Sequence, residues 1–313
     1  MNRDDVDWKG YWPASVTPFV EGGDRVDHDE FRKLLRWYLA EGMHGILING
    51  STGEWFLQTE DERRAVAELA IEELKGKVPV VIGCTTFRPK DTVRLAQHAR
   101  SIGADGVLFT PPPYMRPTAE EILGFYKAVS DAVEIPMAVY NWPPGTNVDI
   151  GTELASALAD VPNVVAIKDS TLDQSQFFQT LLRVKDRVRV FGPFMSPIGI
   201  AALKYIGGDG FIGGSMSLGR EQPEFFEAVW RGDDRRAMEI CRKSSLAFNL
   251  LNNPDFSGKF GGGQMRNVMR ILGQPGGHAR PPRLEVTDPE KIAAIRSALE
   301  KAGLLKTAEV PAR

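Results

Sequence analysis

Residues 59–109 read TEDERRAVAELAIEELKGKVPVVIGCTTFRPKDTVRLAQHARSIGADGVLF. Two longer stretches in this segment, Thr59–Lys75 and Pro89–Ile102, repeat apolar residues at the spacing of amphipathic helices. Each is followed by a short apolar run, Val78–Gly83 and Gly106–Phe109, and runs of that length bounded by glycine or proline are typical of buried strands. The helices also carry start signals, an acidic capping box in the first and a leading proline in the second. The segment therefore predicts two helix–strand units of an α/β fold.

The same alternation extends over the first roughly 230 residues of the chain. We expect strands at Tyr11–Val16, Gly45–Asn49, Val78–Gly83, Gly106–Phe109, Pro136–Tyr140, Val164–Lys168, Val188–Gly192 and Gly210–Ile212. We expect helices at Asp29–Glu41, Thr59–Lys75, Pro89–Ile102, Thr118–Ala132, Thr152–Ala159, Gln174–Arg183, Ser196–Ile206 and Gln222–Arg231. Eight strands, each followed by a helix, predict a (β/α)₈ TIM barrel. A doubly wound sheet is the alternative fold.

The alternation stops after Gly232. Helical patterns at Asp233–Leu251, Gly263–Leu272 and Asp288–Ala302 follow one another with loops and no strands between them. We therefore expect a catalytic barrel at residues 1–232 and a small C-terminal helical domain at residues 233–313.

Composition narrows the class of protein. The chain has 313 residues, 42% of them hydrophobic, and a net charge of −3, which gives no electrostatic case for nucleic acid or an anionic membrane as a partner. Its four histidines form no cluster with metal-ligand spacing, so we expect no metal site. Cys84 and Cys241 lack CxxC spacing and are expected to be reduced thiols. Without a signal sequence or a membrane-spanning apolar run, the chain is expected to be cytoplasmic.

Lys168 is the most informative single residue, because it ends the apolar run Val164–Ile167. An amine at the end of a buried strand is partly stripped of water, which disfavours its charged form and lowers its pKa. A neutral amine attacks carbonyl carbon, so the position suggests Schiff-base formation. The alternative is that the side chain merely reaches past the strand into solvent.

Other polar groups fall at the carboxyl ends of the expected strands, where barrels of this kind place their chemistry. The segment Asn49–Glu54 contains GSTGE, a turn that can present backbone N–H groups and two hydroxyls to a carboxylate, or be a plain glycine turn. Gly213–Gly219 could bind phosphate. Tyr140 could relay protons to and from an adduct on Lys168, or could simply be an aromatic plug in the barrel mouth.

Four motifs in this order, GSTGE, PYMRP, YN-x-P and AIKDS, resemble those of the dihydrodipicolinate synthase/N-acetylneuraminate lyase family. The resemblance covers essentially the whole chain. It implies a (β/α)₈ lyase, usually a homotetramer, that needs no cofactor and forms an imine between a lysine and a 2-keto acid such as pyruvate.

The resemblance also implies roles for individual residues. Lys168 matches the Schiff-base lysine and Tyr140 matches the tyrosine that relays protons. Ser51 and Thr52 match the hydroxyl pair that binds the keto-acid carboxylate and joins the relay. Tyr114 matches a tyrosine that family members insert into the neighbouring subunit's active site.

Gly192 and Ile212 match positions that line the keto-acid pocket, but two other positions depart from the family pattern. Gly145 stands where dihydrodipicolinate synthases carry an arginine that binds the carboxylate of aspartate semialdehyde. Residues 193–196, PFMS, are largely apolar where sialic acid lyases supply acidic groups. We therefore expect aspartate semialdehyde to be a poor substrate and a neutral-tailed one to be better. Aromatic side chains expected to line this region are Trp55, Phe56 and Trp142.

The sequence thus predicts a Schiff-base lyase, an aldolase or a dehydratase, acting on a 2-keto acid such as pyruvate or a 2-keto-3-deoxy acid. One alternative is dihydrodipicolinate synthase itself, with another residue in place of the missing arginine, for which Arg116 is the nearest candidate. Another is a catalytically silent barrel that binds a keto acid.

Overall fold

The computed structural model describes residues 1–214, 219–251 and 264–305. Its centre is an eight-stranded parallel sheet in the order β1-β8-β7-β6-β5-β4-β3-β2. The strands are β1 (Gly10–Pro13), β2 (Ile46–Ile48), β3 (Val80–Gly83), β4 (Gly106–Phe109), β5 (Met137–Asn141), β6 (Val164–Asp169), β7 (Arg189–Phe191) and β8 (Gly210–Gly213). A bridge between Ala14 and Leu47 and a hydrogen bond from Ser15 N to Leu47 O (2.8 Å) join the two edge strands. The predicted (β/α)₈ barrel is confirmed.

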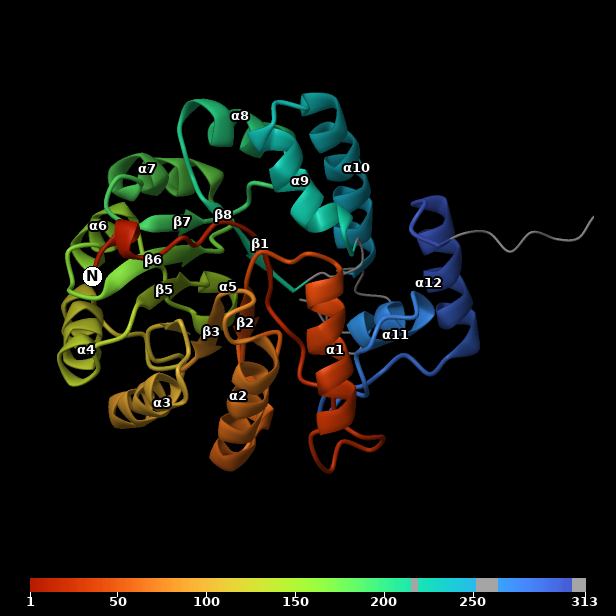
Figure 1. Cartoon of the computed structure of the whole chain (residues 1–313), viewed down its shortest axis with the longest axis horizontal. Helices are drawn as coiled ribbons and strands as arrows, with labels where there is room; N and C mark the ends of the chain where they lie inside the picture. The colour runs from red at the N-terminus through yellow and green to blue at the C-terminus, as the bar shows by residue number, and fades with distance from the viewer. Residues whose placement is uncertain (215–218, 252–263, 306–313) are drawn as a thin grey trace, which may run out of the picture.

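Helices cover the outside of this barrel (Figure 1). They are α1 (His28–Ala40), α2 (Glu60–Leu74), α3 (Pro89–Ile102), α4 (Ala119–Ala132), α6 (Thr152–Leu158), α7 (Gln174–Val184), α8 (Pro197–Tyr205) and α9 (Glu221–Trp230). All eight were expected, with ends that differ by a few residues because terminal turns depend on local capping. The sequence missed α5 (Pro143–Thr146), a single turn directly after β5, because its two prolines and glycine resemble a loop.

Apolar side chains form two layers, as the alternation of side chains along a strand requires. One layer lies between the strands and the helices. The other fills the barrel interior, and it includes Trp12, Leu108, Tyr140, Phe191 and Ile212. The barrel is therefore a packed core, and the polar groups that can do chemistry lie at the strand ends.

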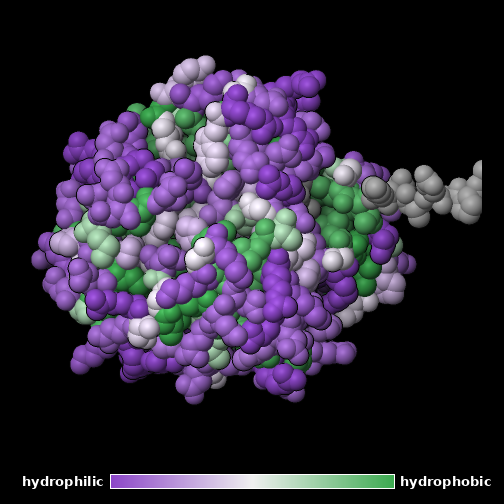
Figure 2. Space-filling view, viewed as in Figure 1, coloured by the Kyte–Doolittle hydropathy of each residue, from purple (hydrophilic) through white to green (hydrophobic). Residues whose placement is uncertain are grey.

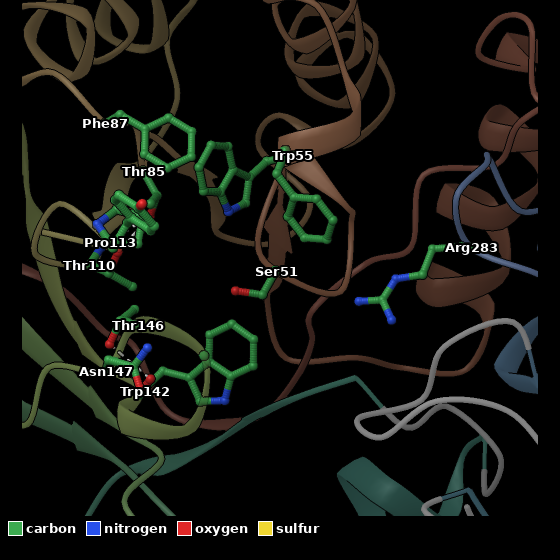
Figure 3. Close-up of a pocket in the computed structure, with 13 residues that line it drawn as sticks. Ser51, Trp55, Thr85, Phe87, Thr110, Pro113, Trp142, Thr146, Asn147 and Arg283 are labelled. Atoms are coloured by element: carbon green, nitrogen blue, oxygen red, sulfur yellow. Dashed lines mark hydrogen bonds between the residues drawn. The ribbon is translucent and has the colours of Figure 1, made fainter.

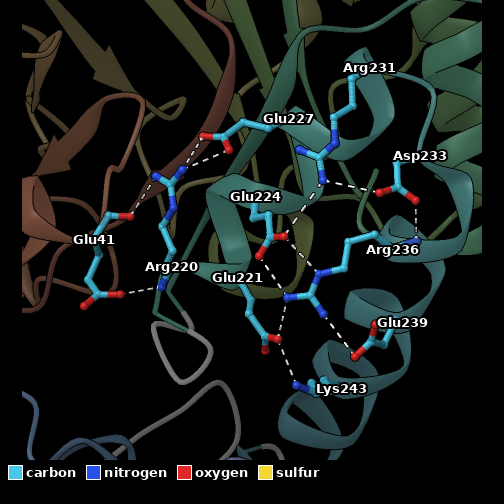
Figure 4. Close-up of polar contacts among 10 residues, drawn as sticks. All are labelled: Glu41, Arg220, Glu221, Glu224, Glu227, Arg231, Asp233, Arg236, Glu239 and Lys243. Carbon is cyan, nitrogen blue, oxygen red and sulfur yellow. Dashed lines mark hydrogen bonds and ion pairs between the residues drawn. The ribbon is translucent and has the colours of Figure 1, made fainter.

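In the described part of the chain, three helices follow the barrel: α10 (Asp234–Leu251), α11 (Gln264–Ile271) and α12 (Pro289–Lys301). Arg236 at the start of α10 pairs with Glu221 and Glu224 of α9, both at 2.8 Å (Figure 4). Helices α11 and α12 pack on each other beyond α1 and α10, with hydrophobic side chains gathered beside them (Figures 1 and 2). The helices agree with the sequence patterns, and the domain boundary at residue 232 stays a prediction.

No described helix has the length and apolar character needed to cross a membrane.

Candidate active site

Lys168 and Tyr140 face each other across neighbouring strands. They are register partners in the β5–β6 pair, and both side chains are turned into the barrel. Lys168 is only 6% exposed, and its Nζ lies 3.9 Å from the centroid of the Tyr140 ring. Burial lowers the pKa of Lys168 from 10.5 to about 7, because the charged amine loses its water. The amine does not reach solvent, and a large fraction of it is neutral at physiological pH.

The Tyr140 side chain is buried in the barrel interior. Burial raises the pKa of its phenol above the ordinary value, and hydrogen bonds with the Ser170 and Ser51 side chains lower it in part. Its ring stacks on Trp142, with centroids 6.1 Å apart and planes 7° from parallel. The phenol is therefore protonated at neutral pH and connected to two hydroxyls through which a proton can move. Sequence reasoning quoted Ser170 within AIKDS and assigned it no role.

The expected carboxylate-binding turn lies beside this pair. Asn49 and Glu54, at its ends, both have left-handed backbones with φ of 56°. The turn points Ser51 toward Tyr140, and it brings Thr52 to the end of β8, where a Cβ on Gly214 would lie 2.6 Å from Thr52 Oγ1. Ser51 and Thr52 thus reach the same barrel mouth from β2. The rest of the proposed phosphate site, residues 215–218, lies outside the described residues.

The two expected pocket-lining positions differ in what they do. Ile212 of β8 lies in the barrel interior with Tyr140. Gly192 follows β7, and a Cβ there would lie 2.1 Å from the Phe177 ring of α7. The absence of a side chain at Gly192 therefore lets helix α7 pack closely, and only the backbone at this position remains to face the strand ends.

A cavity of about 360 Å³ opens outside the Ser51 hydroxyl (Figure 3). Its aromatic walls are Trp55, Phe56, Phe87 and Trp142, so the three expected aromatic residues do line it. Hydroxyl groups come from Ser51, Thr85, Thr110 and Thr146. Because Ser51 also bonds to the Tyr140 side chain, the cavity adjoins the reactive pair.

Gly145 lies on the cavity wall with Trp142 folded against it. A Cβ at Gly145 would lie 2.1 Å from the indole ring, and Gly145 N donates to Trp142 O at 3.0 Å. The indole therefore occupies the space that an arginine at this position would need. The lack of a side chain at Gly145 therefore makes room for Trp142.

Two buried polar groups hold these loops, and sequence reasoning missed both. Arg63 of α2 donates to the carbonyls of Gly83 and Thr85 at 2.9 and 3.0 Å and lies 5.2 Å from the Trp55 ring centroid. On the other side of the cavity, Asn141 Nδ2 donates to Asp169 Oδ1 at 2.9 Å.

Asn141 is also the acceptor of a bond from Ile150 N at 2.9 Å, so it fixes the YN-x-P loop at both ends. Burial raises the pKa of Asp169 to about 6, with bonds from Thr171 N and Asn141 acting against it. The signal for this pair was present in the sequence, since Asn141 and Asp169 directly follow Tyr140 and Lys168.

Two further residues, Tyr114 and Arg283, lie at the cavity mouth. Tyr114 is 89% exposed and has a left-handed backbone with φ of 82°. Arg283 reaches the cavity from the loop before α12 and is the only charged side chain among the described lining residues. No sequence pattern pointed to Arg283.

The chain matches known proteins along most of its length. The model of the dihydrodipicolinate synthetase family matches residues 7–302. The 4-hydroxy-tetrahydrodipicolinate synthase of Rhodopseudomonas palustris (strain BisA53) is 35% identical over 305 residues, which cover 95% of this chain and 98% of that one.

Solved structures of this family are similar to the chain as well. Dihydrodipicolinate synthase from Aquifex aeolicus is similar with a TM-score of 0.83 and 30% identity, covering 96% of this chain and 100% of that one. A structure described as the first monomeric dihydrodipicolinate synthase variant has a TM-score of 0.85 and 27% identity, covering 95% of this chain and 98% of that one. The similarity includes the C-terminal helices as well as the barrel.

Proposed function

The chain belongs to the dihydrodipicolinate synthetase family and is a Schiff-base-forming lyase that acts on a 2-keto acid, and from this premise we propose that Lys168 is its nucleophile and pyruvate its simplest substrate. The observation that carries the proposal is the buried Lys168 amine, with a pKa of about 7, above the Tyr140 ring. Ser51 and Thr52 are the groups that bind the keto-acid carboxylate, and Ile212 and the Gly192 backbone complete its pocket.

The chemistry follows from a neutral amine next to a protonated phenol. Lys168 Nζ attacks the ketone carbon, the carbonyl oxygen leaves as water, and the nitrogen of the resulting imine, once protonated, withdraws electrons from C3. Loss of a C3 proton gives an enamine. In condensation its C3 attacks an aldehyde carbon, and the aldehyde oxygen takes a proton from Tyr140. In cleavage the same C3–C4 bond breaks, and the Tyr140 oxygen takes the proton of the C4 hydroxyl while it passes its own proton to a hydrogen-bonded serine hydroxyl. In dehydration the enamine instead expels the C4 hydroxyl, which takes a proton from Tyr140 and leaves as water.

Borohydride reduction tests the nucleophile. In the presence of pyruvate, the intact mass of the protein should increase by one reduced adduct, and peptide mapping should place it on Lys168. An adduct on another lysine, or none with pyruvate or a 2-keto-3-deoxy acid, would remove the proposed mechanism and favour the silent-barrel alternative.

The pH profile gives a second prediction. Only the neutral amine is a nucleophile, and the pKa of Lys168 is lowered to about 7. We therefore expect kcat/KM with pyruvate to fall about tenfold for each pH unit below about 7 and to level off above it, since the fraction of neutral amine follows the titration of one group. Steady-state rates between pH 5 and 9 check this. A rate that still rises tenfold per pH unit up to pH 9, as expected for a lysine with the ordinary pKa of 10.5, would contradict the proposed role of burial.

We also propose that the active unit is a homotetramer in which Tyr114 completes a neighbour's site. Tyr114 is largely exposed, and Phe56, Phe87 and Met115 are exposed as well. A left-handed backbone at a bulky residue is costly and persists where surrounding structure requires it. Contact of these side chains with a second copy of the chain would cover them and bring the Tyr114 hydroxyl to the partner's relay.

Sedimentation velocity is the measurement for this prediction. The parent should sediment at four times the chain mass, and Tyr114→Ala should shift it to smaller species with a large loss of turnover. Tyr114→Phe is the matched control: it keeps the apolar ring and the association, and loses only the hydroxyl contribution to rate. A fully active monomer at assay concentration would refute the proposal.

A further inference from the structure

The cavity beyond the reactive lysine has one positively charged wall. In Figure 3 the guanidinium of Arg283 is directed into the cavity, toward the side that holds Ser51 and Trp142. Its side chain is 34% exposed, so it is accessible from the cavity and partly shielded from bulk water. In such a site a charge attracts an anion more strongly than it would on an open surface.

The charges around Arg283 do not cancel. Glu54 lies between two arginines, with its Oε2 3.3 Å from Arg266 Nη2 and its Oε1 3.8 Å from Arg283 Nε. Arg266 is 2% exposed and also donates to two carbonyl oxygens, so it holds Glu54 as part of the core. Among the described residues, Glu54 is the one carboxylate within ion-pair distance of either guanidinium group, so one positive charge is left over. Within the described part of the chain, the Arg283 guanidinium has this long ion pair and a contact with the Phe56 ring, and makes no hydrogen bond.

The loop that carries Arg283 is firmly attached. Arg280, three residues earlier, bonds the Glu62 carboxylate at 2.6 and 2.7 Å and the Leu57 carbonyl at 2.8 Å. It also packs against the Phe19 ring, 4.1 Å from the centroid, and Arg283 N donates to Arg280 O at 3.0 Å. Arg280 is therefore a positioning residue that fixes the C-terminal loop against the start of α2 and presents Arg283 at the cavity.

We propose that Arg283 binds the carboxylate of an anionic aldehyde that condenses with the keto acid held on Lys168. The inference rests on the proposed function and specifies its second reactant. Guanidinium groups bind carboxylates through two parallel hydrogen bonds, and the Nη atoms of Arg283 are available for them among the described contacts. In the direction of cleavage, the same carboxylate is the far end of the 2-keto acid that is split.

This assignment changes the expectation drawn from Gly145. The absence of a cation after β5 argued for a neutral-tailed reactant, because the sequence could not show that a residue 138 positions later lines the same cavity as Gly145. The structure places a cation on that cavity from the C-terminal extension, while Trp142 occupies the space beside Gly145.

The test compares two aldehydes that differ in one carboxylate, succinate semialdehyde and butanal, each with pyruvate. We expect the parent to prefer the anionic aldehyde, and Arg283→Gln to lower kcat/KM for it by roughly 10- to 100-fold, the usual worth of a charge-assisted contact. The value for butanal should stay within about twofold of the parent. Arg32→Gln is the matched control, since Arg32 is also 34% exposed and pairs with glutamates on the outside of the barrel; it should leave both values unchanged.

Borohydride trapping with pyruvate separates this inference from the proposed function. If the adduct forms on Lys168 in parent and variant, but Arg283→Gln affects both aldehydes equally or neither, the inference is wrong and the proposed function stands. A parent that forms the adduct and condenses neither aldehyde also overturns the inference. If no adduct forms in the parent, the proposed function itself fails.

Discussion

Lys168→Ala should reduce turnover of any 2-keto acid by at least about 10⁴-fold, because it removes the atom that forms the covalent intermediate. Tyr140, whose ring lies 3.9 Å from the Lys168 amine, cannot replace it as the nucleophile, because the Tyr140 phenol is protonated. Borohydride reduction with pyruvate should leave the mass of this variant unchanged. Steady-state kinetics and intact-mass spectrometry are the two measurements.

The matched control is Lys127→Ala, which removes an exposed lysine on α4 and should leave both rate and adduct intact.

Lys168→Met fills the same space without a charge and should fold as well as the parent or better. Below pH 10.5 the unfolded chain holds a proton on Lys168 more tightly than the folded chain does, whose pKa is about 7. The free energy of unfolding of the parent should therefore rise with pH between these values, and Lys168→Met should lose that part of the slope. If the Lys168→Ala variant keeps the turnover of the parent, the imine mechanism is ruled out.

The fold could be read from the sequence because its signals are local and repeated. Each apolar run of three to six residues and each amphipathic stretch could be assigned separately, and the count of eight pairs decided the architecture. The reactive centre was accessible for the same reason, since Lys168 and Tyr140 each end a strand. Parallel strands place their carboxyl ends at one edge, so the two residues had to meet there.

The residues that were missed depend on contacts between distant segments. Arg283 lies in a loop of the C-terminal extension, and only the attachment of Arg280 to Glu62 brings it to the cavity. Arg63 looks like one more charged residue of an amphipathic helix, yet the structure buries it beneath Trp55. Neither the periodicity of a helix nor the composition of a loop specifies such an approach, because both are consistent with solvent exposure.

Tyr140→Phe is expected to lower kcat by roughly 10²- to 10⁴-fold, the usual contribution of a positioned acid or base. The substitution keeps the ring that stacks on Trp142 and lies below Lys168, so packing and the environment of the amine are retained. What is lost is the phenolic proton, which the buried environment keeps in place at neutral pH by raising the pKa of Tyr140. Imine formation should slow, but the reduced pyruvate adduct should still accumulate on Lys168 given time, unlike in Lys168→Ala.

Tyr126→Phe is the control that shows whether a lower rate comes from the loss of proton transfer or from the loss of a buried hydroxyl. Tyr126 is another fully buried phenol whose pKa is raised by burial, but its hydroxyl bonds to backbone groups, the carbonyl of Phe109 on β4 and the backbone of Tyr140, and it contacts the Tyr140 main chain rather than the Tyr140 hydroxyl. Removing that hydroxyl should cost about 2 kcal/mol of stability, the worth of two buried hydrogen bonds, and leave kcat close to the parent value, because the Tyr140 hydroxyl is retained. If Tyr126→Phe and Tyr140→Phe lose rate to the same extent, the loss reflects packing of the barrel. If Tyr140→Phe alone loses rate, the proton passes through the Tyr140 hydroxyl and its Ser51 and Ser170 partners.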